Sequence, residues 1–186
     1  SQDDDMTLTD TLAEGLLRVV RDSTFKVLND PTNYRYRAQI MWASSLAHND
    51  LTGCGTTPDF ATHMLEHELF DVAHGAGLAA LWGSWARYTY RENVSRFVRF
   101  AVNVMGIDND FTDPESTALA GIKAMEDFYR AIGMPVSIRE LIGREATDEE
   151  IRLMADKCSR NGSVTAGNFK KLNREDMEAI YRMANQ

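Results

Sequence analysis

Apolar residues recur at helical spacing from the beginning of the chain. Residues 8–29 carry them every three to four positions, with Thr9 as the expected N-cap and Pro31 just beyond the end. A second stretch, residues 32–48, ends before the turn-rich segment LTGCGTTPD. Its apolar stripe consists of Tyr34, Ala38, Met41, Trp42 and Leu46. The two stretches predict an antiparallel pair of helices.

Six further stretches have helical periodicity or helix-boundary residues. They cover residues 57–69, 78–90, 93–105, 114–132, 148–157 and 174–184. Residues 78–90 are apolar on nearly all sides, which predicts burial, and Gly75 and Gly77 are expected to precede this helix. Thr147 and Asn173 are the expected N-caps of the last two helices. Because no stretch alternates between apolar and polar residues, we expect an all-α fold of about eight helices.

Composition agrees with one globular domain over residues 1–186. Hydrophobic residues make up 44% of the chain and charged residues 26%. The net charge of -8 argues against a nucleic-acid partner, since such domains concentrate positive charge. No apolar run approaches the ~20 residues that cross a bilayer, and the acidic start SQDDDMTLTD is unlike a signal peptide, so no membrane partner is expected.

The two cysteines bear on the cellular compartment. Cys54 and Cys158 lie far apart and form no C-x-x-C pair. Neither a disulfide framework nor a thiolate zinc site is therefore indicated. A reducing, cytoplasmic location is the expectation.

The four histidines are the main candidates for chemistry. His48, His63, His67 and His74 fall within 27 residues. His63 and His67 are four positions apart, so on a helix both project from one face, and His74 follows within two further turns. For His48 a structural role is the simpler interpretation. For the other three histidines a divalent metal site is favoured over hydrogen bonding inside a core.

The acidic residues around these histidines add no clear ligand. Imidazole ligands suit Zn, Fe, Co or Ni, and an added carboxylate shifts the preference towards Fe(II) or Zn. The candidates are Asp59, Glu66, Glu68 and Asp71, and none is convincing as a direct ligand. Glu66 and Glu68 flank His67 on the other side of the helix, which leaves open whether they support a ligand or are solvated charges.

Other motifs give weaker evidence of a functional site. Gly75 and Gly77 do not form a dinucleotide fingerprint, because no strand precedes them and no third glycine follows at the required spacing. Gly55 is followed by two threonines but lacks the Lys-Ser/Thr of a phosphate loop. Several aromatic residues at helical spacing are expected in the core rather than on a stacking surface: Trp42, Trp82, Trp85, Phe97 and Phe100.

Long segments resemble one enzyme family. MWASSLAHNDLTGCG, DFATHMLEHEL and FDVAHGAGLAALWGSWARY are similar to the C-terminal helical domain of iron-containing alcohol dehydrogenases, in particular the butanol dehydrogenase branch. The likeness continues through SIRELIGREATDEEIRLMADKC and GNFKKLNREDMEAIYRMA, and so covers essentially all of the chain. It implies the all-α, metal-binding half of a dehydroquinate-synthase-like fold of two domains.

The resemblance also implies a chemistry. In the family one divalent metal, iron or alternatively zinc, is held by an Asp, a His four residues later and two more histidines, which match His63 and His74. His67 matches a histidine that is not a ligand and lies near the nicotinamide and the substrate. The implied reaction is hydride transfer between a small alcohol or aldehyde and NAD(H) or NADP(H), with the metal as Lewis acid. A homodimer is compatible with this assignment.

The chain departs from the family pattern at its start. The first two metal ligands and the nucleotide-binding domain of the family precede the stretch that matches Ser1, so residues 1–186 are expected to lack them. We therefore expect the isolated chain to bind metal weakly and to be inactive. The alternative is a stand-alone helical binding module that kept the family's packing without catalysis, with histidines in structural roles as a third interpretation.

A second departure lies between the histidines themselves. The family spaces the two matching ligands by fourteen residues, whereas His63 and His74 are eleven apart, so three residues are missing between Leu69 and Phe70. A real deletion beside the site would be expected to misplace His74. The favoured alternative is that the natural chain carries these residues in a mobile loop, because the motif is intact on both sides.

Overall fold

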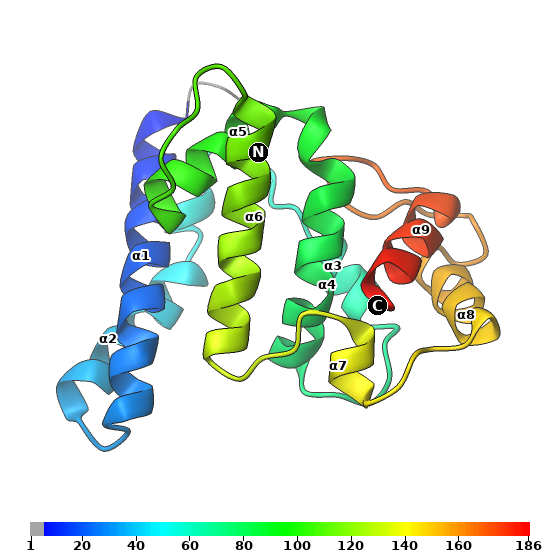
Figure 1. Cartoon of the computed structure of the whole chain (residues 1–186), viewed down its shortest axis with the longest axis horizontal. Coiled ribbons are helices and arrows are strands. Elements are labelled where there is room, and N and C mark those ends of the chain that lie inside the picture. Colours follow the sequence, from blue (N-terminus) through cyan, green and yellow to red (C-terminus); the bar gives the residue numbers. More distant parts are fainter. Residues whose placement is uncertain (1–5) are drawn as a thin grey trace. The chain divides into compact units, whose positions relative to one another are not determined.

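The computed structural model of the chain describes residues 6–186. Over this range it contains nine α-helices and no β-strand, which confirms the all-α expectation (Figure 1). In chain order these helices are α1 (Thr7–Asn29), α2 (Tyr34–Ala47), α3 (Ala61–Glu66), α4 (His74–Thr89), α5 (Val94–Phe100), α6 (Pro114–Ala131), α7 (Ile138–Ile142), α8 (Asp148–Cys158) and α9 (Arg174–Ala184).

The helices fall into two compact units. Unit 1 comprises Ser1–Pro58 and Ser95–Gly121, and unit 2 comprises Asp59–Val94 and Ile122–Gln186. Helix α6 begins in unit 1 and continues into unit 2. The expectation of one helical domain stays a prediction, because two compact units can belong to one folding domain.

In unit 1, α1 and α2 lie side by side as the expected antiparallel pair (Figure 1). The Asn33 side chain caps α2 by accepting from the backbone N–H groups of Arg35 and Tyr36. The expectation that Thr9 caps α1 was wrong. Thr9 lies inside the first turn, and its hydroxyl donates to the Cys54 carbonyl at 3.0 Å instead of accepting from the helix.

Charged side chains of α1 bind the segment that follows α4. Arg96 donates to Asp10 through two contacts of 2.6 Å, and Arg99 forms an ion pair with Glu14. The helix expected over residues 93–105 changes at Ala101 into a π-helical turn. Arg18 and Arg21 donate to two carbonyl groups of that turn, which satisfies acceptors that the altered backbone leaves free.

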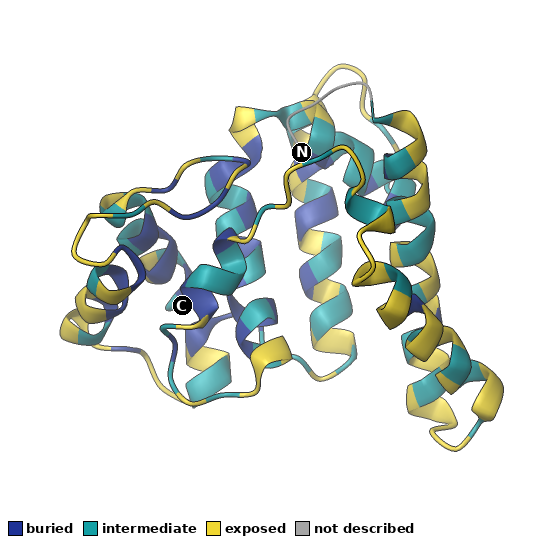
Figure 2. Cartoon of the chain, turned by 180° about the vertical axis from the view of Figure 1, so that it is seen from behind, coloured by how far each residue is buried: buried dark blue, intermediate teal, exposed yellow. Residues whose placement is uncertain are grey.

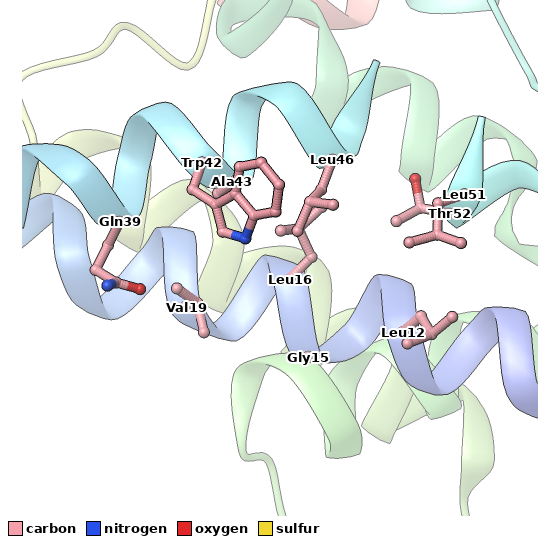
Figure 3. A pocket seen from close by; sticks show the side chains of 10 residues that line it. All are labelled: Leu12, Gly15, Leu16, Val19, Gln39, Trp42, Ala43, Leu46, Leu51 and Thr52. Carbon is pink, nitrogen blue, oxygen red and sulfur yellow. The ribbon is translucent and has the colours of Figure 1, made fainter. Parts of the chain in front are cut away.

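The apolar stripe of α2 is largely exposed. Tyr34, Met41 and Trp42 have exposed fractions of 82%, 68% and 64%, so the expectation that Trp42 lies in the core was wrong. Much of the α1–α2 pair is accordingly yellow in Figure 2. A hollow of about 230 Å³ between the two helices is lined by Leu16, Trp42 and their apolar neighbours (Figure 3). In a pair of helices each helix covers one face of the other, and the remaining faces stay open to solvent.

Unit 2 has a closed apolar core. Helix α9 lies between α4 and α8 in Figure 1 and contacts both. The largest completely buried apolar side chains of this unit come from six helices and the loop before α9: Leu65, Leu81, Ile122, Ile138, Ile151, Leu172, Met177, Ile180 and Tyr181. The Tyr181 hydroxyl donates to the Leu65 carbonyl at 2.7 Å, so its buried polar end is satisfied.

Helix boundaries in unit 2 were predicted unevenly. Thr147 and Asn173 cap α8 and α9 as expected, each within a capping box. Helix α7 was missed, because its five residues are too few to show a helical period. Helix α4 begins at His74, so Gly75 and Gly77 lie in its first turn and do not precede it, contrary to expectation. In residues 6–186 we find no helix with the length and apolar character of a membrane span.

Candidate functional site

Three of the four histidines meet in unit 2. His63 lies in α3, His67 is the C-cap residue of α3, and His74 is the first residue of α4. The ring centres of His63 and His74 are 5.2 Å apart, and those of His67 and His74 are 6.2 Å apart. His48 lies in unit 1, where its Nδ1 is 2.8 Å from the Ser44 carbonyl, in keeping with a structural role.

Helix α3 is held by its neighbours on the side away from these rings. The Asp59 carboxylate accepts from the backbone N–H of Ala61 at 2.9 Å and from those of Asn168 and Phe169 at 2.7 Å each. Asp59 therefore anchors the start of the helix and does not reach the histidines. Ala61 and the buried Leu65 pack into the core. With that face fixed, the position of His63 is fixed as well.

The histidines line an open hollow of about 490 Å³. Its walls come from the end of α3, the connection to α4 and the start of α4: His63, Glu66, His67, Leu69, Phe70, Asp71, Val72 and His74. Of the four acidic candidates, Glu66 and Asp71 line this hollow, whereas Asp59 and Glu68 do not. The site thus combines three imidazoles, two carboxylates and three apolar side chains.

Glu66 contacts one of the histidines directly. The Nδ1 of His74 donates to the Glu66 carboxylate at 2.7 Å. The Glu66 side chain is only 7% exposed, whereas the His74 side chain is 55% exposed. For Glu66 the geometry therefore favours the role of a supporting partner over that of a solvated charge. Spacing along the sequence did not show this, because the partner lies eight residues later, beyond the end of α3.

The ring of His63 is more enclosed than the ring of His74. Its Nδ1 is buried without a hydrogen-bond partner, and its ring packs edge-on against Phe60 at 5.2 Å between centres. Burial lowers the pKa of His63, and the neighbouring His74 lowers it further. The neutral imidazole, which is the form that binds metals, is therefore favoured. With Nδ1 enclosed, Nε2 is the nitrogen left to meet a ligand.

The donor set fits part of a metal site. Two imidazoles that share one tetrahedral ion have ring centres about 5 Å apart, because metal–nitrogen bonds are about 2.1 Å. The His63 and His74 rings meet this condition. Across residues 6–186, however, no three His, Cys, Asp or Glu side chains are arranged so that they could hold an ion. Within these residues the fit is therefore limited to the spacing of this one pair of rings.

The shortened spacing does not keep the rings apart. Helix α3 stops at Glu66, and the chain turns back through residues 67–73 into α4. His63 and His74 therefore approach each other although they are eleven residues apart in sequence. That the natural chain carries three more residues between Leu69 and Phe70 stays a prediction.

A family model matches nearly the whole chain. The Fe-containing alcohol dehydrogenase family, C-terminal, matches residues 2–185. The probable NADH-dependent butanol dehydrogenase 1 of Bacillus subtilis (strain 168) is 35% identical over 176 residues, which are 93% of this chain and 44% of that protein. The NADPH-dependent aldehyde reductase YqhD of Escherichia coli (strain K12) is 30% identical, over 97% of this chain and 46% of that protein.

A solved structure has a similar fold. The crystal structure of NADH-dependent butanol dehydrogenase A from Thermotoga maritima superposes with a TM-score of 0.87 and 29% identity, over 96% of this chain and 46% of that one. The chain therefore spans about half the length of the relatives that it matches.

Proposed function

The chain belongs to the Fe-containing alcohol dehydrogenase family, and from that premise we propose that it is the helical metal-binding part of an NAD(P)-dependent alcohol dehydrogenase or aldehyde reductase. The complete enzyme would transfer hydride between a small primary alcohol and the nicotinamide. The observation that carries this proposal is the approach of His63 and His74, whose ring centres are 5.2 Å apart at the edge of an open hollow.

In this proposal His63 and His74 each bind the metal through Nε2. The Nδ1 of His63 is enclosed by protein, and the Nδ1 of His74 is held by Glu66, so both outer nitrogens remain available. The ion is a divalent metal, iron or alternatively zinc, and its other ligands come from outside these residues. When bound, it supplies Lewis-acid chemistry that lowers the pKa of an alcohol and polarises a carbonyl.

His67 has a different role in the proposal. It lines the same hollow, and its ring centre is 6.2 Å from that of His74. Its side chain is exposed at the end of α3, where it can exchange protons with solvent. We assign it to proton transfer with the substrate oxygen, a role that suits imidazole near neutral pH. We assign no residue of this chain to the nicotinamide cofactor.

The test uses the protein in its full natural length. His63→Ala and His74→Ala should each lose the bound metal after dialysis, measured by mass spectrometry of the metal, together with alcohol oxidation in the presence of NAD or NADP. His67→Ala should keep the metal while kcat falls by about 10²–10⁴, the range of a lost acid or base. The 186-residue chain alone should show no turnover.

His48→Ala is the matched control, because it removes a histidine outside the hollow. Metal content and kcat should both stay at the level of the unchanged protein. Full metal content in the His63→Ala and His74→Ala variants would overturn the ligand assignment. A full-length protein that neither binds metal nor oxidises alcohols would instead favour the non-catalytic binding module. A cytoplasmic location and a homodimer stay predictions.

A further inference from the structure

We propose that Glu66 is a positioning residue that holds the ring of His74 for metal binding, and that residue 77 is glycine so that Glu66 can reach this place. The inference rests on the proposed function, since it concerns how one of the two ligand rings is held. It adds two residues, one acidic and one without a side chain, to the three histidines of the site.

The ring of His74 needs an external support. It is the first residue of α4, and its side chain is 55% exposed, so packing alone leaves the ring free to rotate. The hydrogen bond from Nδ1 to the Glu66 carboxylate at 2.7 Å removes that freedom. It also places the ring proton on Nδ1 and leaves the lone pair on Nε2, which is the tautomer that a metal requires on that side.

Glu66 is itself rigidly placed. Its side chain is 7% exposed, next to the completely buried Leu65. Burying a carboxylate is costly unless a donor meets it, and His74 donates to Glu66. An apolar side chain of similar size would fill the space without that cost. Core stability alone therefore does not account for a glutamate at this position.

Gly77 provides the space that Glu66 occupies. A Cβ atom at residue 77 would lie 2.7 Å from Cγ and 2.9 Å from Oε1 of Glu66, closer than real Cβ contacts. The Glu66 side chain thus lies directly against the backbone of the first turn of α4. At Gly75, two residues earlier, an added Cβ would meet nothing within 4 Å. A side chain at residue 75 would therefore leave Glu66 in place, whereas one at residue 77 would collide with it.

The first experiment measures Co²⁺ affinity in the full-length protein by competition with a chromophoric chelator. Glu66→Ala should weaken binding about 10–100-fold, as the loss of an orienting partner does at other metal sites. Glu66→Gln keeps a neutral oxygen acceptor and should recover part of this loss. Asp71→Asn is the control, because it removes a carboxylate from the same hollow that makes no recorded bond to a histidine. Its affinity should change less than that of Glu66→Ala.

The second experiment tests Gly77 with a double-mutant cycle. Gly77→Ala should weaken Co²⁺ binding about as much as Glu66→Ala, because the new methyl group pushes the carboxylate away. In the Glu66→Ala background the same change should have little further effect, since the atoms it would strike are gone. Gly75→Ala adds the same methyl group in open space and should leave the affinity unchanged.

A third measurement reads the ring of His74 without any metal. In protein labelled with ¹⁵N histidine, the His74 signals should report the Nδ1–H tautomer, and Glu66→Ala should shift them towards a mixture of tautomers. Unchanged His74 signals and unchanged Co²⁺ affinity in Glu66→Ala would overturn the positioning role. Failure of the proposed function would look different, because Co²⁺ binding would then be insensitive to His63→Ala and His74→Ala while the tautomer shift remained.

Discussion

In unit 2 Leu81, Ile180 and Tyr181 are completely buried, whereas in unit 1 Tyr34, Met41 and Trp42 are each more than 60% exposed. Both regions consist of helices with apolar stripes, so the stripes themselves do not explain the contrast. The two regions differ in how many helices pack against each helix. Helix α4 contacts α3, α7 and α9, whereas the α1–α2 pair is flanked mainly by short turns.

Partly buried ion pairs occur in both units. In unit 1 Asp10–Arg96 and Glu14–Arg99 bind α1 to the segment around α5. In unit 2 the mostly buried carboxylate of Glu126 pairs with Arg87, and Arg144–Glu150 lies at the surface. What sets unit 2 apart is therefore its closed apolar core. The histidine site belongs to unit 2, where a packed core fixes α3 and α4.

The largest expected effect compares the same substitution in the two units. Leu81→Ala in α4 should lower the free energy of unfolding by about 3 kcal/mol, because a completely buried leucine leaves a cavity. Leu28→Ala in α1, where the leucine is 55% exposed, should cost about 1 kcal/mol or less. Urea unfolding followed by circular dichroism measures both. Equal losses would remove the distinction between the two units.

The next effect concerns the ion pair of unit 1. Arg96→Met keeps the side chain's bulk but removes both hydrogen bonds to the enclosed Asp10, which keeps Arg99 at 3.5 Å, so we expect a loss of about 2 kcal/mol in the free energy of unfolding. Arg144→Met breaks a more exposed pair in unit 2 and should lower the free energy of unfolding clearly less than Arg96→Met does. The same urea experiment measures both variants. A loss at Arg144 as large as that at Arg96 would contradict the expected difference between an enclosed and an exposed ion pair.

The smallest effect is the contribution of Asp10 in unit 1 to the pH dependence of stability. Hydrogen bonds from Arg96 hold the pKa of Asp10 below its ordinary value of 3.8, against the opposing effect of burial. The ionised Asp10 carboxylate thus contributes fully to stability above about pH 4, and this contribution is lost as the pH falls through the lower, folded-state pKa. The loss should be smaller than in Arg96→Met, because the arginine can still donate to a protonated carboxyl group.

Hydrogen exchange read by mass spectrometry measures this pH effect helix by helix. Between pH 4 and pH 2, protection corrected for intrinsic exchange should fall in α1. In Asp10→Asn, which lacks the titrating group, that fall should be smaller. An equal fall in α1 of both proteins would count against a contribution from Asp10.

Much of the fold could be predicted from local patterns. The capping boxes at Thr147 and Asn173 and the apolar face of residues 78–90 are encoded within a few residues of one another, and the structure has them as expected. Helix α7 and the exposure of Trp42 could not be predicted in this way. The first is too short to show a period, and the second depends on which elements pack against α2.

For the candidate site, the sequence by itself determined the family and the clustering of the histidines, and it led to the proposal of imidazole ligands, because residue identity and spacing are local properties. Only the tertiary structure decided that Asp59 anchors α3, that Glu66 binds His74, and that Gly77 makes room for Glu66. These three contacts depend on how the chain turns between α3 and α4 and on which backbone lies opposite each side chain. Spacing along one helix cannot specify either.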